Sequence, residues 1–329
     1  MGVHIREVLK MFRNKNNKIF LLSSHQNLEG DALGSQLALA QLLKSLKKKV
    51  IMYAPDEVPA AYSFLPDTGR VKTGADAKET DYDVACILDC TGLDRLGDMK
   101  RVIDFKRPII NIDHHISNTY FGTVNWVEPG FSCTGEQIYR LFKEMDIPIN
   151  KKAALSMYVA ILTDTGSFRY SNTTARSHEA AAELIRKGLK PTDIYRKIYE
   201  VAHRSHLALL SRVLSTLEMT KDGSVAWTSV TEGMMKAHKA NAEVAQDFVN
   251  FPRSIKGVKI AMGFREEGKG SVKVSFRSNE GIDVCRLAKQ CGGGGHHSAS
   301  GCTMKGSLDE VKEAVLIKTA KYLKGLERK

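Results

Sequence analysis

The 329-residue sequence has no apolar run long enough to span a membrane, and its first 18 residues contain no signal-peptide core. Its six cysteines show no zinc-like pairing, and a chain of this length does not need disulfide bonds to build a core. Internal repeats are absent, and low complexity is confined to a glycine run at residues 292–295. We therefore expect a soluble cytoplasmic protein with reduced thiols and no membrane partner.

The composition is that of a globular protein, with 43% hydrophobic and 26% charged residues. A chain of this length can form two domains, each with its own core. The formal net charge of +12 favours anionic partners such as phosphates or nucleic acid. This signal is weak, because surface lysines are usually just solvated.

Strand-like and helix-like segments alternate along the first half of the chain. Buried strands are predicted at residues 18–22, 50–55, 83–89 and 107–113, after an amphipathic helix that carries Ile5, Val8, Leu9 and Phe12. Residues 154–166 are apolar up to Asp164, and periodicity alone allows either a helix or a strand there. This α/β alternation predicts a doubly wound parallel sheet over residues 1–190.

The second half has a different pattern. A helical linker is predicted over residues 191–223, and a smaller α/β domain over residues 224–329, whose strands alternate as if half-exposed. Ser307 and Glu310 have the spacing of a capping box for a final amphipathic helix.

Acidic and histidine residues gather where the predicted apolar segments of the first domain end. The first group lies in the stretch SSHQNLEGDALGS, residues 23–35, and the full set is His25, Glu29, Asp31, Asp89, Asp113, His114, His115 and Asp164. The carboxyl ends of parallel strands share one edge of the sheet, so these side chains are expected to converge on one crevice. So many carboxylates cannot share a pocket without compensation. A pair of divalent cations resolves this conflict, and oxygen with imidazole donors suits Mn²⁺ or Mg²⁺.

Each residue taken alone has an ordinary structural explanation. An aspartate after a strand is most often a helix cap or a turn residue, and a histidine pair is usually a surface or hydrogen-bonded core feature. Four such groups after four apolar segments are much less probable by chance. The set therefore favours a functional site.

These motifs resemble those of the DHH phosphoesterase superfamily. The matching stretches are HQNLEGDALGS, the strand end at Asp89, DHH at 113–115, DTGSF at 164–168 and, for the associated C-terminal domain, GGGGHHSASGC at 292–302. They occur in the family's order and cover nearly the whole chain. The family pattern usually has Pro-Asp where this chain has Leu28-Glu29, so this ligand keeps its charge but is one methylene longer.

The resemblance implies a role for each member of the set. One metal ion would be held by His25, Glu29 and Asp89, and the other by Asp31, Asp89, His114 and Asp164, with Asp89 bridging the two. His115 would contact the phosphoryl oxygen, and Asp113 would orient the histidines. The two ions are expected to be Mn²⁺, with Mg²⁺ or Co²⁺ as alternatives.

The second domain is expected to bind substrate. Glycine runs are usually flexible linkers, but this one lies between a helical stretch and a small-residue segment inside the domain. The expected phosphate-binding residues are Gly293, Gly294, Gly295, His296 and His297, with Arg277 and Ser278 added by the resemblance. Arg265 is a weaker candidate.

The resemblance is strongest to the branch of the family that hydrolyses short oligoribonucleotides (nano-RNA) to mononucleotides and dephosphorylates 3′-phosphoadenosine 5′-phosphate. Three alternatives stay open: a phosphodiesterase for cyclic or linear dinucleotides such as c-di-AMP and pApA, a single-strand DNA exonuclease, and a non-catalytic RNA-binding module. The expected partners are short RNA oligonucleotides and phosphorylated nucleotides, with homodimer formation as an open option. The pyrophosphatase branch has a different C-terminal domain.

Overall fold

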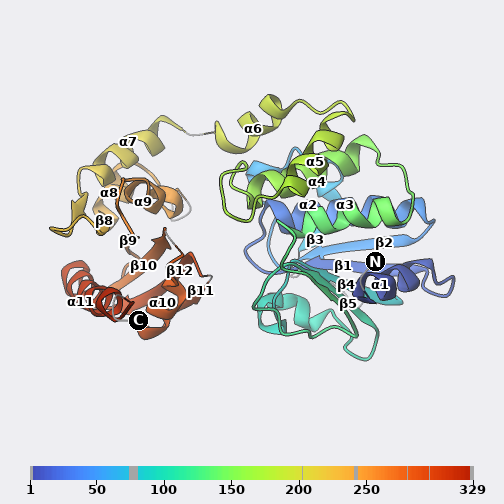
Figure 1. Ribbon diagram of the computed structural model, residues 1–329, viewed down its shortest axis with the longest axis horizontal. Coiled ribbons are helices and arrows are strands. Elements are labelled where there is room, and N and C mark those ends of the chain that lie inside the picture. Colours follow the sequence, from blue (N-terminus) through green and yellow to red (C-terminus); the bar gives the residue numbers. More distant parts are fainter. Residues whose placement is uncertain are drawn as a thin grey trace. The chain divides into compact units, whose positions relative to one another are not determined.

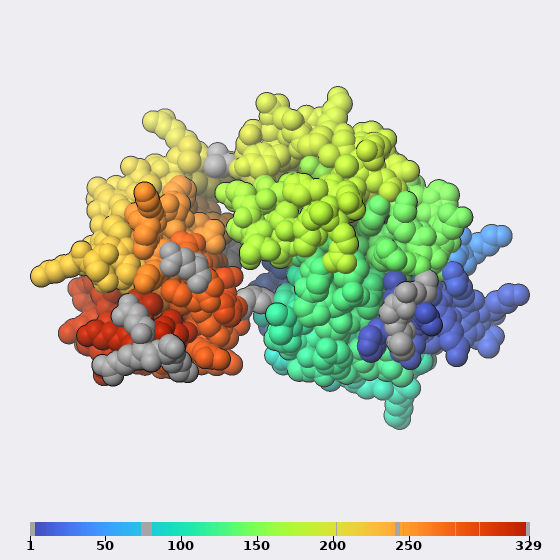
Figure 2. Space-filling model, viewed as in Figure 1, coloured from blue at the N-terminus to red at the C-terminus, as the bar shows by residue number. Residues whose placement is uncertain are grey.

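The computed structural model describes residues 3–73, 81–201, 203–240, 244–279, 281–295 and 297–326. The chain forms two compact units, residues 1–201 and residues 202–329, and each is described by itself (Figure 1). A space-filling view shows the surface of each unit, coloured by residue number (Figure 2). Among the described residues, no helix has both the length and the apolar character to cross a membrane.

The first unit contains a six-stranded parallel sheet in the order β3-β2-β1-β4-β5-β6. Its strands are β1 (Ile19–Ser24), β2 (Lys49–Ala54), β3 (Val71–Thr73), β4 (Val84–Leu88), β5 (Ile109–Asp113) and β6 (Val124–Val127). Strands β4 and β5 are buried throughout, as expected when both faces of a parallel sheet are covered. The strand order reverses between β1 and β4, which creates a crevice outside their carboxyl ends, where α/β proteins bind ligands.

Six α-helices belong to the described part of this unit. They are α1 (Val3–Arg13), α2 (Gly30–Ser45), α3 (Thr134–Glu144), α4 (Lys151–Asp164), α5 (Ala175–Ile185) and α6 (Pro191–Tyr199). Their apolar residues form one large core with the side chains of one sheet face, and α2, α3 and α4 lie together in Figure 1. A smaller core on the other face includes Leu96 and Met99 of the 3₁₀ segment η4 (Leu93–Arg101). Two shorter 3₁₀ turns, η1 (Ala60–Tyr62) and η2 (Thr68–Arg70), connect β2 to β3.

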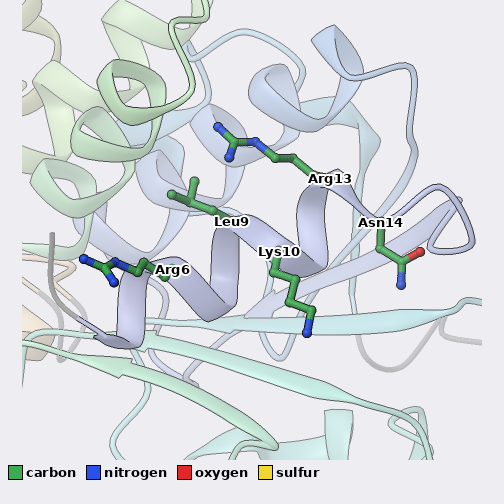
Figure 3. A pocket seen from close by; sticks show the side chains of 5 residues that line it. All are labelled: Arg6, Leu9, Lys10, Arg13 and Asn14. Atoms are coloured by element: carbon green, nitrogen blue, oxygen red, sulfur yellow. The ribbon is translucent and has the colours of Figure 1, made fainter.

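The four predicted strands of this unit are confirmed as β1, β2, β4 and β5, whereas β3 and β6 were not predicted. The amphipathic helix is confirmed as α1, whose four apolar residues are all buried. Its polar residues, together with Leu9, line a surface pocket (Figure 3): Arg6, Leu9, Lys10, Arg13 and Asn14. These residues belong to α1 and the turn after it and not to the strand ends.

The second unit contains a mixed six-stranded sheet in the order β11-β12-β10-β9-β8-β7, in which only the β8–β9 pairing is parallel among the described strands. The strands are β7 (Glu218–Met219), β8 (Val225–Val230), β9 (Ile260–Glu266), β10 (Ser271–Ser278), β11 (Gly294–Gly295) and β12 (Ala299–Lys305). The helical segments are α7 (Arg204–Leu214), α8 (Glu232–Ala237), η5 (Gln246–Val249), α9 (Asn250–Arg253), α10 (Val284–Gln290) and α11 (Leu308–Leu326).

The expected alternation of half-exposed strands is confirmed for β10 but is wrong for β8. All six residues of β8 are buried, because one set of its side chains joins the core beneath α10 and α11 while Val230 packs with Leu209 and Val213 of α7. The capping box is confirmed, since the Ser307 amide donates to Glu310 Oε2 at 2.8 Å and the Glu310 amide to Ser307 Oγ at 3.4 Å.

The predicted linker, residues 191–223, contains α6, α7 and β7. The boundary between the two compact units of the chain lies between residues 201 and 202, inside this predicted linker. The domain boundaries at residues 190 and 223 stay predictions.

Candidate metal centre

Three neighbouring strands deliver most of the predicted site residues to one edge of the first sheet. His25 follows β1, Asp89 follows β4, and Asp113 ends β5 directly before His114 and His115. Strand β4 pairs with both β1 and β5, so the three strand ends are adjacent. These residues therefore come together because their three strands are neighbours in the sheet.

Asp164 reaches the same place by a different route. It is the last residue of α4 and not the end of a strand, so the expectation that all four groups follow strands is wrong for this one. The segment forms a helix because its buried small and apolar residues pack along α2, where the backbones approach closely enough that a Cβ on Gly34 would lie 2.4 Å from the Ser156 carbonyl oxygen. Asp31, in the first turn of α2, and Asp164 therefore share the crevice.

His114 Nε2 lies in the middle of three carboxylates. It is 3.9 Å from Asp31 Oδ2, 3.6 Å from Asp89 Oδ1 and 3.7 Å from Asp164 Oδ2. The other oxygen of Asp89, Oδ2, faces His25 Nε2 at 3.4 Å, and His25 Nε2 is 3.7 Å from Glu29 Oε1. The two oxygens of Asp89 thus face two different groups of ligands.

Donor atoms in this crevice are spaced closely enough to hold metal ions. Three overlapping groups have donor atoms within 4.8 Å of one another: His25–Glu29–Asp89, Asp31–His114–Asp164 and Asp89–His114–His115. Asp89 Oδ2 and His114 Nε2 are buried and have no hydrogen-bond partner. Buried polar atoms without a partner are costly unless a ligand satisfies them. These residues therefore fit divalent cations.

The outer nitrogens of the two candidate histidine ligands are already hydrogen-bonded. His25 Nδ1 lies 2.7 Å from the Gln26 carbonyl oxygen, and His114 is hydrogen-bonded to the Phe131 backbone. In metal sites the second imidazole nitrogen usually donates to such an acceptor, which fixes the tautomer and the ring orientation. In both residues Nε2 is then left to face the carboxylates.

His115 is held differently. Its Nδ1 lies 2.7 Å from Asp113 Oδ1, which also accepts from the backbone amides of His114 and His115 at 2.9 and 3.4 Å. Burial lowers the pKa of His115, but this hydrogen bond and the charge of Asp89 outweigh it and raise the pKa to about 9. The ring therefore carries a proton near neutral pH and is oriented by Asp113, whose side chain is fully buried.

Burial and mutual repulsion separate the pKa values of the carboxyls. Burial and the charge of Asp89 raise the pKa values of Asp31 and Asp164 well above the ordinary value. Burial also acts to raise the pKa of Asp89, but the adjacent His25 ring and the charges of the histidines hold this pKa below the ordinary value. For His25, burial lowers the pKa, while Asp89 and Glu29 raise it to about 11. The centre thus holds protons that bound cations would displace.

The amino terminus of α3 contributes contacts that the sequence did not predict. The amides of Thr134 and Gly135 each donate to Asp31 at 2.8 Å, and Thr134 Oγ1 donates to Asp89 Oδ1 at 3.2 Å. A helix amino terminus favours negative charge. Gly135 permits the approach, because a Cβ there would lie 2.3 Å from Ala160 Cβ.

Two asparagines also hold members of the site. Asn172 Nδ2 donates to Asp164 Oδ2 at 3.1 Å, and Asn118 Nδ2 donates to Asp113 Oδ2 at 2.5 Å. Both asparagines lie close in sequence to the residues they hold, in DTGSFRYSN and DHHISN. Only this closeness to the motifs could have identified the two asparagines from the sequence.

The residues predicted to bind substrate lie in the second unit. Arg277 is partly buried near the end of β10, with Nη1 3.0 Å from the Phe276 carbonyl oxygen, and His297 is exposed. Ser278 is buried, and its hydroxyl donates to the Ile282 carbonyl at 2.6 Å. His296 lies outside the described residues.

The glycine run is part of the folded second unit. Gly294 and Gly295 form β11, which pairs with β12. A Cβ on Gly293 would lie 2.1 Å from the Gly301 carbonyl oxygen, and Gly295 has φ 139°. These positions therefore require glycine for close backbone approach and for an unusual backbone angle.

Comparison with known proteins identifies both domains of the chain. Residues 19–161 match the model of the DHH family, N-terminal domain, and residues 222–324 match the DHHA1 domain. The bifunctional oligoribonuclease and PAP phosphatase NrnA of Thermus thermophilus is 31% identical over 95% of this chain and 91% of that protein. The chain belongs to the DHH family. The resemblance predicted from its five motifs is confirmed.

Other members of the family match over similar lengths. The protein of the same name from Bacillus subtilis is 28% identical over 88% of this chain and 90% of its own length. The crystal structure of an exopolyphosphatase-related protein from Bacteroides fragilis is 30% identical, covers 98% of this chain and 96% of that chain, and has a TM-score of 0.90. The predicted α/β fold class is confirmed.

Proposed function

We propose that this DHH-family protein is a hydrolase that cleaves short oligoribonucleotides to mononucleotides and removes the 3′-phosphate of 3′-phosphoadenosine 5′-phosphate. The observation that carries this proposal is the convergence of His25, Asp89, His114 and Asp164 around buried, unpartnered donor atoms at the sheet edge. Relatives that match at least 88% of this chain are named oligoribonuclease and PAP phosphatase, which supports the choice of substrate.

The donor set divides into two ion sites that share Asp89. His25 and Glu29 face Asp89 Oδ2 on one side, and His114 faces Asp89 Oδ1 on the other. Asp31 and Asp164 complete the second group. Two divalent ions bound in such a site supply the charge that activates water and stabilises the oxygens of an in-line displacement at phosphorus. The mixture of carboxylate and imidazole donors supports Mn²⁺, with Mg²⁺ or Co²⁺ as alternatives.

His115 is the candidate proton donor. Asp113 fixes the ring through Nδ1, and the raised pKa keeps the imidazole protonated near neutral pH. A protonated imidazole also carries a hydrogen on Nε2, and this N–H is the group that would donate to a phosphoryl oxygen or to the leaving group. Asp113 acts through His115 and is a positioning residue.

Substrate recognition is assigned to the second unit. Arg277 offers a guanidinium, which suits a phosphate group. The backbone at Gly293–Gly295 and the exposed His297 offer further donors. We further propose that the protein acts in the cytoplasm, and homodimer formation stays a prediction.

The test is a substrate panel offered to purified protein with Mn²⁺. The panel contains oligoribonucleotides from two to ten residues, cyclic and linear diadenylates, and 3′-phosphoadenosine 5′-phosphate. Release of mononucleotides from the shortest RNAs and of phosphate from the bisphosphate, both lost with chelator, is the expected result. Faster cleavage of the cyclic compound would favour the cyclic-dinucleotide alternative, and binding without cleavage would favour the RNA-binding module.

A further inference from the structure

Three tyrosines that the proposed chemistry does not use lie next to the metal centre. Tyr170, Tyr195 and Tyr199 are 39%, 41% and 40% exposed. We propose that they form, with Arg169, a surface on which a nucleobase of the substrate stacks while its phosphate occupies the metal centre. This proposal rests on the proposed function and adds to it a site for the base.

A strained turn connects Asp164 to this surface. Gly166, Ser167 and Phe168 are consecutive residues with φ of 55°, 60° and 64°. For the two non-glycine residues this left-handed conformation is unfavourable and persists only where surrounding contacts impose it, often at functional sites. The contacts here include the Ser167 amide donating to the Leu162 carbonyl at 2.7 Å.

Tyr170 covers this turn. Its ring packs against Gly166, where a Cβ would lie 2.4 Å from the ring carbon Cζ. Gly166 is the second residue after Asp164, so their Cα atoms lie within about 7 Å of each other. The Arg169 guanidinium lies 6.0 Å from the Tyr170 ring centroid, and its Nε donates to the Gly166 carbonyl at 2.7 Å. An aromatic face and a cation are thus held on the turn that directly follows a candidate metal ligand.

Helix α6 supplies the other two rings. Their centroids are 4.8 Å apart at an interplanar angle of 45°, and the Tyr199 side chain is hydrogen-bonded to Ser167. The packing face of α6 is a different one, because Ile194 and Ile198 are the buried residues of this helix. The tyrosines are therefore not needed to anchor α6 in the core. The region of α5 and α6, yellow-green in Figure 2, forms part of the surface in that view.

A nucleobase is the occupant that this chemistry fits. Proteins that bind single-stranded nucleic acids stack bases on aromatic side chains and on arginine, and neutralise the backbone with positive charge. The tyrosines are uncharged, Arg169 is cationic, and the adjoining crevice is built to receive a phosphate. Stacking does not depend on base identity, so this surface suits an enzyme that accepts short RNAs of any sequence.

The test compares one substrate with and without its base. Hydrolysis of 3′-phosphoadenosine 5′-phosphate and of ribose 3,5-bisphosphate is measured with Mn²⁺ for the wild type, Tyr195→Ala and Tyr195→Phe. Loss of one stacking ring is expected to raise KM for the adenosine compound by about 5-fold to 150-fold. The phenylalanine variant keeps a ring and is expected to stay within about twofold of the wild type. For the base-free compound, the alanine variant is expected to change KM by less than about twofold.

Phe105→Ala is the matched control, because Phe105 is an aromatic side chain, 51% exposed, that lies before β5 at the opposite edge of the sheet. An equal rise in KM for both compounds, or none for either, would overturn the proposal, provided circular dichroism shows a folded variant. Quenching of a 2-aminopurine nucleotide by the wild type, and its loss in Tyr195→Ala, reports stacking without hydrolysis. If the wild type cleaves nothing but still quenches, the proposed function fails and the stacking surface stands.

Discussion

Replacement of Asp113 by asparagine separates a positioning role from direct metal binding. Asp113 Oδ1 accepts from three N–H groups, including His115 Nδ1, and Oδ2 accepts from Asn118. An asparagine has one acceptor oxygen, so its NH₂ group must face either His115 or the Asn118 amide. Asn118 cannot readily turn around, because its oxygen accepts from the Tyr120 amide at 2.7 Å and its nitrogen donates to the Cys90 carbonyl at 3.0 Å.

The expected losses follow from these contacts. One unsatisfied buried donor costs about 1–3 kcal/mol of unfolding free energy, which lowers Tm by about 2–12 °C for a unit of this size. Loss of an outer partner of a site histidine typically lowers activity by about 10-fold to 100-fold. Asp89→Asn is the comparison, since it removes a charge that both proposed ion sites share. Loss of several kcal/mol of transition-state stabilisation there lowers the rate by about a thousandfold or more.

The assay is phosphate release from 3′-phosphoadenosine 5′-phosphate over a Mn²⁺ titration, with Tm measured for each variant. Asp113→Asn is expected to retain measurable kcat at saturating Mn²⁺, whereas Asp89→Asn is not. If a folded Asp113→Asn variant loses as much activity as Asp89→Asn at every Mn²⁺ concentration, Asp113 acts in the metal centre and the present assignment is wrong.

Three further outcomes are expected. Burial and the charge of Asp89 raise the pKa values of Asp31 and Asp164, so Mn²⁺ binding should release protons and weaken as the pH falls. Calorimetry in two buffers of different ionisation enthalpy measures the number of protons released. Mn²⁺ binding without proton release would contradict this expectation. Gly135→Ala should lower Tm and Mn²⁺ affinity, because its Cβ would collide with α4, whereas Gly69→Ala, with open space around it, should change the unfolding free energy by less than about 0.5 kcal/mol. Arg277→Ala should raise KM for a ribodinucleotide by about 10-fold to 150-fold, which corresponds to the loss of one charged hydrogen bond. Cleavage of a small chromogenic phosphodiester should hardly change. Equal loss of activity on both substrates would refute the assignment of Arg277 to substrate binding.

The site residues at the carboxyl edge of the sheet could be predicted from the sequence, because the end of a strand is a local feature. Each apolar run that stops at His25, Asp89 or Asp113 marks a carboxyl end, and a parallel sheet brings such ends together whatever their separation along the chain. Asp164 was harder to place, because a buried helix and a buried strand are both apolar on every side. Strands β3 and β6 are short, three and four residues long, and have no fully apolar run to mark them.

The contacts around the ligands could not be predicted in the same way. Thr134 and Gly135 lie more than 100 positions from Asp31, yet both of their amides bond to its carboxylate. Backbone amides carry no sequence signature of their own, so such a contact follows only from the packing of α2 against α3 and α4. The contact between the Tyr195 and Tyr199 rings follows from their helical spacing, which the sequence shows. The position of this pair beside the turn after Asp164 depends on where α6 packs.

The difference in burial among the candidate ligands offers a physical reason for the departure from the family pattern at Leu28-Glu29. Asp31 accepts three hydrogen bonds, from Thr134, Gly135 and Ser35, and its carboxylate is held by the fold itself. An additional methylene there would have to be accommodated in a close-packed interior, which costs about 1–3 kcal/mol. Glu29, in contrast, has a side chain that is 57% exposed, and its carboxylate lies 3.7 Å from His25 Nε2. A longer side chain at this position extends into solvent and can still bring its carboxylate within reach of the ion site. The substitution therefore occurs at the ligand where packing opposes it least.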